Sequence, residues 1–461
     1  MHLQFLGGTD TVTGSKHLIT CNGANVVRDF GMYQGRRDES EKINRQLGLD
    51  PARLQNVLIS HAHIDHCGML PLLVASGYQG PVHATTATAK LCEIMLRDSA
   101  HIQESDAGYL NQKTNRKGLP AVQPLYTMRD AEAAIRLFKG HGYRQPIDLA
   151  PGLSMEAWDA GHILGSAMTT FTLEEQGRRV RVGYAVDLGR HDLPLIRDPE
   201  VMKDVDVLVM ESTYGNRTHD DATQAEEQIR AVVQRTLDRG GKVLIPSFAL
   251  ERAQEVIYHL SSLMMAGRLP KVDVFLDSPM ASAVTRVFDG SREYLDEDSQ
   301  SLFRSMGCLT CPPWIKLSET VAQTKAITGS SKPAIIIAAS GMCEHGRILH
   351  HLKQGITNPR NSIVLVGYQA SYTLGRRLQE QQTRVRIFGD WFERQAEVVS
   401  LQAFSAHADR NDLIAYVRAL RPKKTFLVHG EQEGREALAE ALRAEKLGDV
   451  FLPTKGDKVE L

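Results

Sequence analysis

The sequence has no apolar run that approaches the roughly 20 residues of a membrane-spanning helix. Its first residues, MHLQFLGGTDTVTGSKH, also lack a basic segment followed by an apolar one, so we expect neither a membrane protein nor a secretory signal. Cysteine is scarce: the 461 residues contain six, and they do not resemble the disulfide framework of a secreted protein. These absences predict a cytoplasmic protein with reduced thiols.

A surplus of one charge is also lacking, since 54 Lys and Arg residues balance 55 Asp and Glu residues to a formal net charge of −1. A nucleic-acid-binding protein usually carries a basic surplus. Any basic surface here would therefore be local, for example at Arg178–Arg181 or Arg421–Lys424. Cys308 and Cys311 form one CxxC motif without the second pair that a structural zinc site needs, so we interpret both as loop residues.

The length predicts two or three domains. Short strand-like segments dominate up to about residue 205, with helices expected at 69–75 and 86–104 and a surface loop at 106–120. Apolar strands and helices then alternate, as in VDVLVMES, GKVLIPS, VDVFLDS, PAIIIAAS and NSIVLVGY. Such alternation is typical of a mostly parallel sheet buried on both faces. Short strands return in AEVVSLQAF and KTFLVHG near the end.

Histidines and an aspartate crowd the segment SHAHIDHCG, where the strand-like run VLIS gives way to a helical pattern. His61, His63, Asp65 and His66 are therefore expected in a turn at the end of a strand, which can direct several side chains to one point. Imidazole and carboxylate are zinc ligands, and a catalytic zinc keeps one position open for water. Four ligands within six residues are crowded for one such ion and fit two neighbouring ions.

Further ligands are expected where other strands end. His162 lies in the Gly-flanked turn of DAGHILGSA, Asp187 follows the apolar run of RVGYAVDLGR, and His429 follows that of FLVHGE. A carboxylate at Asp187 is suited to bridging two ions. The recurring order of apolar strand, polar residue and glycine indicates a shared site more strongly than any single match.

Taken together, these residues resemble the metallo-β-lactamase superfamily. Further motifs resemble its β-CASP branch of nucleic-acid-processing nucleases: MESTYGNR (210–217), FSAHADR (404–410), LVHGE (427–431), PSFALERAQE (246–255), ASGM (339–342) and DFGMYQG (29–35). The likeness covers essentially the whole chain. It looks closest to bacterial and archaeal relatives of the endonuclease subunit of the eukaryotic mRNA 3′-end cleavage complex.

The resemblance implies an α/β fold class, an αββα metallo-β-lactamase sandwich with an inserted α/β β-CASP domain built on a parallel sheet. We expect the sandwich to begin at 1–207, the inserted domain at 208–394, and the completion of the sandwich at 395–461. The chain starts almost at once with HLQFLGG and ends soon after FLPTKGDKVEL. We therefore expect neither the KH domains of archaeal members nor the C-terminal extension of ribonuclease J.

The resemblance also implies two zinc ions per chain. Their ligands would form two groups joined by a bridging carboxylate: His61, His63 and His162; Asp65, His66 and His429; and Asp187 as the bridge. Asp29 looks like the family's first-motif aspartate, which orients a ligand histidine without touching metal. Zinc suits this ligand set, but manganese or iron could also occupy it.

Glu211 and His407 match the family's acidic residue and histidine around the leaving group, and Asp65 is expected to act in catalysis as well as in metal binding. Phosphodiester hydrolysis needs a proton for the leaving 3′-oxygen, and an imidazole titrates near the working pH. His407 is therefore the candidate general acid. Glu211 would hold its ring and favour the protonated form.

Phosphate contacts are expected from the Ser405 hydroxyl, from the glycine-containing turn at 340–342 and from two arginines. Backbone N–H groups in a turn can bind a phosphate, and arginine contacts make binding depend on salt. The candidates are Ser405, Ser340, Gly341, Arg252 and Arg376.

Several functions compete at this stage. RNA-acting family members have histidine where His429 stands, whereas DNA-acting members typically have valine, so the resemblance favours RNA over a DNA nuclease. A catalytically dead scaffold would have broken ligands, and here every candidate ligand is present. A small-molecule hydrolase such as a thioesterase or lactonase needs no inserted domain.

We therefore predict a zinc-dependent ribonuclease that hydrolyses single-stranded RNA. We expect it to cut as an endonuclease, and an additional exonuclease activity stays open. A narrow cleft with a buried pair of metal ions would not easily admit a duplex. A homodimer and RNA-processing partner proteins also stay open.

Overall fold

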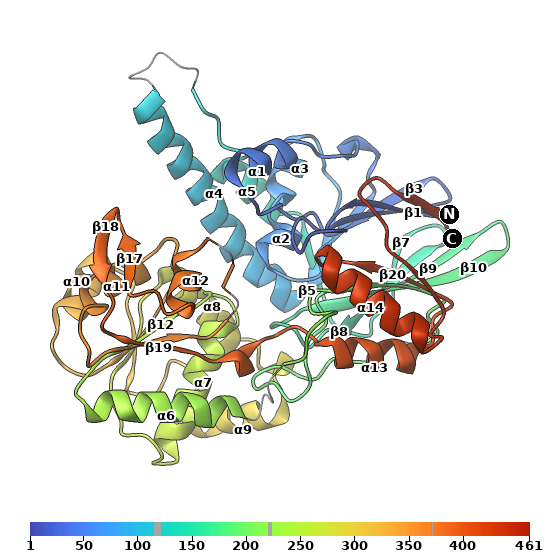
Figure 1. The fold of residues 1–461 in the computed structure, drawn as a ribbon. Helices are drawn as coiled ribbons and strands as arrows, with labels where there is room; N and C mark the ends of the chain where they lie inside the picture. The colour runs from blue at the N-terminus through green and yellow to red at the C-terminus, as the bar shows by residue number, and fades with distance from the viewer. Residues whose placement is uncertain (115–120, 220–223, 368, 371) are drawn as a thin grey trace. The chain divides into compact units, whose positions relative to one another are not determined.

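The computed structural model describes residues 1–114, 121–219, 224–367, 369–370 and 372–461 (Figure 1). The chain forms two compact units. Unit 1 comprises Met1–His191, Asp198–Thr218 and His407–Leu461, and unit 2 comprises Asp192–Arg197 and His219–Ala406. No helix in the described part of the chain combines the length and the apolarity that crossing a lipid bilayer demands.

Two β-sheets form the centre of unit 1. The first has the strand order β22-β1-β2-β3-β4-β5-β6 and the second the order β21-β20-β11-β10-β9-β8-β7. The strands of the first sheet are β1 (His2–Gly7), β2 (Lys16–Cys21), β3 (Ala24–Arg28), β4 (Asn56–Leu58), β5 (Val82–Thr85), β6 (Phe138–His141) and β22 (Lys458–Glu460). Those of the second are β7 (Ile147–Ala150), β8 (Leu153–Asp159), β9 (Ala167–Glu175), β10 (Arg178–Ala185), β11 (Val207–Glu211), β20 (Lys424–Val428) and β21 (Asp449–Phe451).

Apolar side chains fill the space between the two sheets. Alternating residues of β1, Leu3 and Phe5, point into this core and meet Phe171 of β9 and Phe426 of β20. Each large apolar side chain buried in this way stabilises the fold by about 1.5–3 kcal/mol. The two sheets are therefore held face to face as the middle layers of a sandwich.

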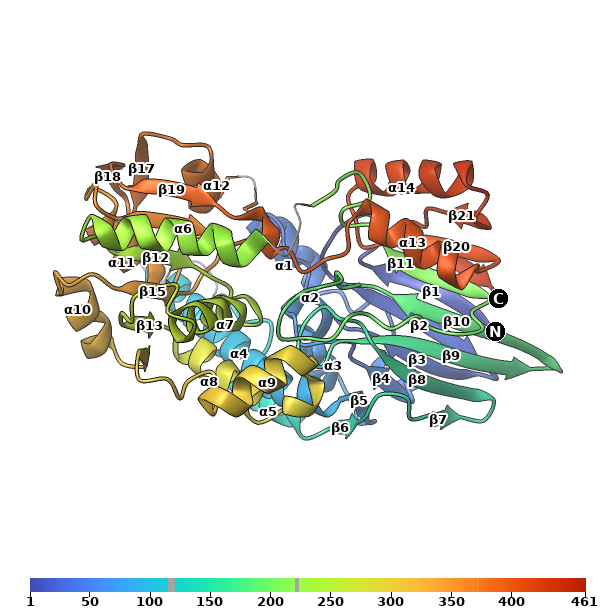
Figure 2. The same ribbon diagram turned by 90° about the horizontal axis from the view of Figure 1, so that it is seen from below.

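Helices cover the outer faces of both sheets in unit 1. Helices α13 and α14 pack over β11 and β20 through a second core that includes Leu208, Leu413, Leu427 and Leu438 (Figure 2). On the other side, α4 packs against β5 and β6, and α3 and α5 pack with each other. The helices are α1 (Arg37–Asn44), α2 (Ile64–Cys67), α3 (Leu70–Ala75), α4 (Thr86–Thr114), α5 (Met128–Ile135), α13 (Arg410–Leu420) and α14 (Gln432–Ala444). This layering confirms the expected αββα sandwich.

Helix α4 is longer than the sequence predicts. The expected surface loop at 106–120 is wrong for residues 106–114, which continue the helix, while 115–120 lie outside the described residues. Ala107 is buried, and the amide of Asn111 exchanges two hydrogen bonds with the backbone of Val122. These contacts stabilise the helix over residues 106–114, although the polar composition of this segment alone does not favour a helix.

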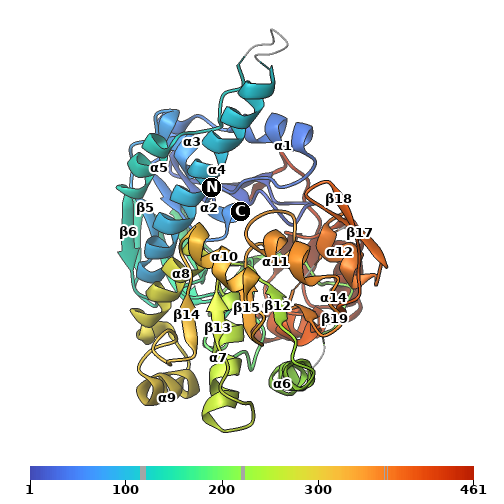
Figure 3. The same cartoon turned by 90° about the vertical axis from the view of Figure 1, so that its left-hand side faces the viewer.

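Unit 2 contains a parallel sheet in the order β14-β13-β15-β12-β16-β19, of which Figure 3 shows β14, β13, β15 and β12 side by side. Its strands are β12 (Val243–Pro246), β13 (Val274–Leu276), β14 (Ile315–Leu317), β15 (Ile335–Ala338), β16 (Ser362–Leu365) and β19 (Glu397–Ser400). A separate hairpin consists of β17 (Arg384–Ile387) and β18 (Asp390–Glu393). The helices are α6 (Ala225–Asp238), α7 (Arg252–Met265), α8 (Pro279–Asp289), α9 (Glu297–Met306), α10 (Val321–Gly329), α11 (Ile348–Gly355) and α12 (Leu374–Gln379).

Strand pairing divides the chain later than the expected boundaries at 207/208 and 394/395. Strand β11 pairs in parallel with β10 and β20 and so belongs to the second sheet of unit 1. Strand β19 pairs in parallel with β16 and so belongs to the sheet of unit 2. The compact units accordingly change at 218/219 and at 406/407.

Cys308 and Cys311 form a disulfide in unit 2, so the expectation of reduced thiols is wrong for this pair. A tight turn, in which the Cys311 backbone N–H donates to the Cys308 carbonyl at 3.3 Å, brings the two side chains together. The remaining cysteines, Cys21, Cys67, Cys92 and Cys343, are free thiols and buried.

Candidate metal centre

The HAHIDH segment follows β4 and forms a short turn that leads into α2. His63 caps the start of α2, Asp65 lies in its only turn, and His66 lies near its end. Backbone hydrogen bonds join this turn to the loop after β3, where Phe30 N–H donates to the His66 carbonyl at 2.8 Å. The approach is so close that a Cβ atom on Gly31 would lie 1.5 Å from the Asp65 carbonyl oxygen. Only glycine fits there, and the turn is fixed as a result.

Three more ligand candidates come from neighbouring strands of the second sheet. His162 lies between β8 and β9, Asp187 follows β10, and His429 follows β20. Strands β10, β11 and β20 are parallel, and β8 runs in the same direction because both β8 and β10 are antiparallel to β9. The carboxyl ends of these strands therefore meet at one edge of the sheet, which is why residues far apart in sequence lie together.

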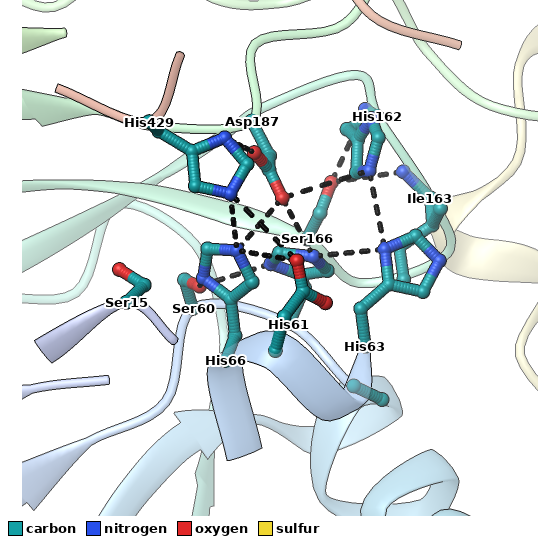
Figure 4. A network of polar contacts seen from close by, with 12 residues as sticks. Ser15, Ser60, His61, His63, His66, His162, Ile163, Ser166, Asp187 and His429 are labelled. Carbon is teal, nitrogen blue, oxygen red and sulfur yellow. Dashed lines mark hydrogen bonds and ion pairs between the residues drawn. The ribbon is translucent and has the colours of Figure 1, made fainter. Parts of the chain in front are cut away.

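Ring nitrogens of the first group converge around the Asp187 carboxylate (Figure 4). His61 Nε2 lies 3.0 Å from both His63 Nδ1 and Asp187 Oδ2. His162 Nε2 lies 3.4 Å from His63 Nδ1. One potential ligand atom from each of these four residues lies within 4.8 Å of the others, close enough to hold a metal ion.

The second group consists of Asp65, His66 and His429, whose potential ligand atoms also lie within 4.8 Å of one another. The Nε2 atoms of His66 and His429 are 3.4 Å apart, and Asp65 Oδ2 lies 3.8 Å and 3.7 Å from them. Asp187 Oδ2 lies 3.0 Å from His66 Nε2 as well as from His61 Nε2. The carboxylate of Asp187 therefore reaches both groups.

Burial keeps the imidazoles of the first group neutral. It lowers the pKa of His61, His63 and His162 from the ordinary histidine value, and that of His63 falls to about 3. A neutral ring offers a lone pair to a metal ion, as zinc binding requires.

The second group favours positive charge. Burial lowers the pKa of His66, but the carboxylates of Asp187, Asp29 and Asp65 raise it further, so that the value lies well above the usual one. A divalent cation bound in this group would balance the negative charge of the carboxylates in place of that proton. The donor set of imidazole nitrogens and carboxylate oxygens therefore fits zinc in both groups.

Asp29 orients His66 from behind. Its Oδ2 atom accepts a hydrogen bond from His66 Nδ1 at 2.8 Å, while Oδ1 accepts one from the Ser60 backbone N–H at 2.8 Å. Burial raises the pKa of Asp29, but Arg28 and His66 lower it further, to well below the usual value. The ionised carboxylate holds Nδ1 and leaves Nε2 of His66 to face the other ligands. A partner of this kind fixes the tautomer of a metal-binding histidine.

His407 and Glu211 form a hydrogen-bonded pair beside the first group. His407 Nδ1 lies 3.1 Å from Glu211 Oε2, and the His407 and His162 ring centroids are 4.5 Å apart. Glu211 is fully buried at the end of β11 and also accepts a hydrogen bond from the Leu188 backbone N–H. Burial lowers the pKa of His407, but Glu211 raises it more, to about 9. The pair therefore presents a protonated imidazole at neutral pH.

Sequence reasoning missed several residues that support these side chains. Arg28 is fully buried and donates to Asp29 Oδ2 at 2.7 Å, and Ser60 Oγ donates to the same atom at 3.0 Å. Ser166 Oγ accepts from the backbone N–H groups of His162 and Ile163, both at 3.2 Å (Figure 4). The one signal available in advance was Arg28 itself, a charged residue directly after the apolar pair Val26 and Val27 at the end of β3.

The five candidate phosphate contacts all lie in unit 2, and the structure shows how each is engaged there. Arg252 is buried and ion-paired with Glu255, while Arg376 is exposed and ion-paired with Glu380 at 2.8 Å. Ser340 Oγ accepts from the Glu344 backbone N–H at 3.2 Å. The others are Gly341, whose carbonyl accepts from Gln369, and Ser405, which is half-buried.

A two-sheet sandwich with histidines and aspartates gathered at the ends of its strands defines a metal-dependent hydrolase of the metallo-β-lactamase fold. Family models agree with this class: residues 18–191 match the Metallo-beta-lactamase superfamily domain, and 391–453 match the Zn-dependent metallo-hydrolase RNA specificity domain. Residues 253–378 match the Beta-Casp domain. The chain belongs to the β-CASP family of the metallo-β-lactamase superfamily, which confirms the resemblance.

Curated relatives cover nearly the whole chain. Ribonuclease TTHA0252 of Thermus thermophilus is 35% identical over 442 residues, 96% of each chain. Transcription termination factor FttA of Thermococcus kodakarensis is 31% identical over 92% of this chain and 66% of its own length. A crystal structure of a protein of unknown function from Enterococcus faecalis V583 aligns with a TM-score of 0.55 at 14% identity, over 100% of this chain and 99% of that one. That likeness shows the fold alone.

Proposed function

We propose that this β-CASP protein is a zinc-dependent ribonuclease that hydrolyses internal phosphodiester bonds of single-stranded RNA. The observation that carries the proposal is the hydrogen-bonded pair of His407 and Glu211. It offers a proton donor next to the metal centre, because the ring centroids of His407 and the candidate ligand His162 are 4.5 Å apart. The names of the relative Ribonuclease TTHA0252 and of the RNA specificity domain matched at 391–453 support RNA as the substrate.

Two zinc ions per chain are part of the proposal. One would be held by His61, His63 and His162, the second by Asp65, His66 and His429, with Asp187 reaching both groups. Zinc bound there supplies a nucleophilic water at neutral pH and neutralises charge on the phosphate. The seven side chains would hold the ions in place at the site. Asp65 would take part in catalysis through its role as one of these ligands.

His407 supplies the proton that the leaving 3′-oxygen needs. A pKa raised to about 9 keeps its imidazole protonated at neutral pH. Glu211 accepts from Nδ1, so that Nε2 is the atom that can donate. A general acid placed in this way typically contributes about 10²–10⁴-fold to the rate.

The test uses single-stranded RNA and a DNA of the same sequence, each labelled at one end, with zinc-loaded wild type and His407→Ala. We expect internal cuts in RNA that leave a 5′-phosphate and a 3′-hydroxyl. His407→Ala is expected to lower the rate about 10²–10⁴-fold. Metal analysis should find the zinc content unchanged, because His407 is proposed as an acid and not as a ligand.

His101→Ala is the matched control, since His101 is an exposed histidine on α4. It should cleave RNA like the wild type. Loss of zinc from His407→Ala would contradict the role of His407 as an acid. Cleavage of DNA in preference to RNA, or of thioester and lactone substrates instead of either polymer, would contradict the proposed substrate.

We also propose that the enzyme acts in the cytoplasm on cellular RNA. Cell fractionation measures this directly, and recovery of the protein outside the cytoplasmic fraction would contradict it. The phosphate contacts expected at Ser405, Ser340, Gly341, Arg252 and Arg376 stay predictions, which the salt dependence of RNA binding by single variants tests.

A further inference from the structure

The β17–β18 hairpin lies in unit 2 (Figure 1). One of its faces is buried and the other is exposed. Val385 and Ile387 are 0% and 1% exposed and belong to the core of unit 2. Side chains alternate along a strand, and directly paired residues share a face. The outer face therefore carries the two pairs Arg384–Glu393 and Arg386–Trp391. Because its inner face is packed, the hairpin presents this outer face rigidly.

Two aromatic rings are exposed on the hairpin. Trp391 is 58% exposed and Phe388 is 52% exposed. Tryptophan is usually well buried, as Trp158 is in the core of unit 1. Exposed apolar surface of this kind marks sites where a ligand or partner binds.

The backbone at Phe388 adds an independent observation. Phe388 and Gly389 form the two-residue loop of the hairpin, with φ of 51° and 92°. Such loops favour Asn-Gly, and a bulky residue with positive φ is strained. The Phe388 ring gains only a partial contact in return, with its centroid 4.8 Å from that of His350. The hairpin thus keeps an exposed ring at a position where the backbone disfavours it.

An arginine lies beside the Trp391 ring. The guanidinium carbon of Arg384 lies 5.4 Å from the Trp391 ring centroid, and Arg386 Nε donates to the Gly389 carbonyl at 2.8 Å. Neither arginine forms an ion pair with any carboxylate in the described part of the chain. By contrast, the neighbouring Asp390 is neutralised by Lys353 at 3.0 Å. Glu393 lies opposite Arg384 in the strand register, so the outer face carries two guanidinium groups and one carboxylate and has a net positive charge that can attract an anionic ligand.

We propose that the exposed side of this hairpin, here called the hairpin surface and defined by the outer-face residues Arg384, Arg386 and Trp391 together with the loop residue Phe388, binds single-stranded RNA. Bases stack on the two rings, and the arginines contact phosphates. Exposed aromatic rings interleaved with cations are how proteins bind single strands without reading their sequence. The inference rests on the proposed function, because it takes RNA as the substrate, and it adds a binding surface that the metal centre does not contain.

The test measures RNA binding by fluorescence anisotropy, with zinc-loaded protein that carries His407→Ala so that the RNA survives. A labelled single-stranded oligonucleotide is the probe. Trp391→Ala is expected to weaken binding about 10-fold, as the loss of one stacked base does. Trp391→Phe keeps a ring and should restore most of the affinity. Arg384→Gln with Arg386→Gln should flatten the salt dependence by about one counterion for each lost contact.

Two control variants change exposed residues elsewhere: Tyr109→Ala, a 57% exposed ring on α4, and Arg304→Gln on α9. Both should bind RNA like the parent protein. A duplex of the same length should compete weakly, because its bases are already stacked.

Equal binding by the hairpin and control variants would overturn the inference, as would equal competition by the duplex. A change from dimer to monomer in sedimentation, with RNA binding intact, would assign the hairpin surface to a second copy of the chain instead. RNA cleavage by the wild type together with unaltered binding by the hairpin variants would leave the proposed function standing and remove only this inference. A wild type that neither binds nor cleaves RNA would remove both.

Discussion

Three residues at the metal centre have backbone conformations that L-amino acids seldom adopt. Asp29, Asp187 and His429 have φ of 60°, 58° and 48°. Aspartate and histidine tolerate this left-handed region better than most residues, yet each such conformation costs about 1–3 kcal/mol. The packed strands that precede these residues must supply that energy. These backbone conformations set the direction in which the three side chains leave the chain.

The first prediction concerns Asp29, which holds His66 Nδ1 at 2.8 Å. Asp29→Asn keeps the shape of the side chain but removes the negative charge that orients and polarises the ring. We expect zinc affinity to fall about 10–100-fold, the usual effect of losing such a partner. Competition with a chromophoric chelator measures it.

Asp38→Asn, a change at an exposed aspartate of α1, is the control for Asp29→Asn. It should bind zinc like the wild type. Unchanged zinc affinity in Asp29→Asn would show that Asp29 does not act through His66.

Part of the metal centre could be predicted at the level of residues. His61, His63, Asp65 and His66 stand within six positions, so local spacing alone brings them together. His162 and His429 were predictable only as residues at strand ends, because their meeting depends on the order of strands in the sheet. Arg28 and Ser60 support Asp29 through contacts that exist only in the folded protein. The charged residue after Val26 and Val27 was a signal for Arg28, whereas no local pattern marks the role of Ser60.

At the scale of elements, apolar strands were easier to predict than their membership in a sheet. The segment AEVVSLQAF was expected to complete the first domain, yet β19 pairs with β16 of unit 2. Its alternation of apolar and polar residues fits an edge strand of either sheet. Which edge it joins depends on the rest of the chain, and periodicity carries no information about that.

A buried carboxylate joins four elements of unit 2. Asp277, which follows β13, accepts from Ser318 at 2.7 Å and from Thr324 of α10 at 2.9 Å. It also accepts from Arg347, the N-cap residue of α11, and from His351 of α11, both at 2.7 Å. Burial raises the pKa of Asp277, but these hydrogen bonds lower it more, to about 2. The folded state therefore favours the ionised carboxylate more than the unfolded chain does.

The second prediction follows from the sign of that shift. A folded pKa of about 2, below the unfolded value near 3.8, adds stability that is present above pH ~4 and is lost as the pH falls towards 2. Asp277→Asn should lower the free energy of unfolding by about 1–3 kcal/mol at neutral pH. The difference from wild type should shrink in acid. Urea unfolding across this pH range measures it.

Hydrogen exchange of α11 is a local readout for the same variant, because Arg347 and His351 lose the negatively charged partner there. Asp273→Asn, which changes an aspartate in the segment before β13, serves as the control. A difference between Asp277→Asn and wild type that stays constant from neutral pH to acid would contradict the assigned role of the charge.

At the scale of the whole molecule, the candidate metal ligands connect the two sheets of unit 1. His61, His63, Asp65 and His66 follow β4 of the first sheet, whereas His162, Asp187 and His429 follow strands of the second. A bound metal ion would therefore tie the two middle layers of the sandwich together at one edge.

The third prediction is that a chelator destabilises unit 1. A ligand present at a thousand times its Kd stabilises the folded state by about 4 kcal/mol, so removing zinc should lower the Tm of unit 1. The melting of unit 2 should change little, because the seven candidate ligands all lie in unit 1. Calorimetry with and without the chelator, followed by addition of zinc, measures both transitions.

His61→Ala is the matching variant for the chelation experiment, since it removes one ligand from the first group. Its Tm should respond less to zinc than that of the wild type. Equal responses to zinc in wild type and variant would place the metal effect elsewhere in the protein.

The ligands are spread along the chain from position 61 to position 429 of 461 residues. A ribosome must therefore synthesise the chain as far as β20 and the last ligand, His429, before the seven ligands can come together. The message being translated is itself single-stranded RNA and lies beside the growing chain. Until His429 has been synthesised, the growing chain lacks one of the ligands proposed to bind the metal beside that message.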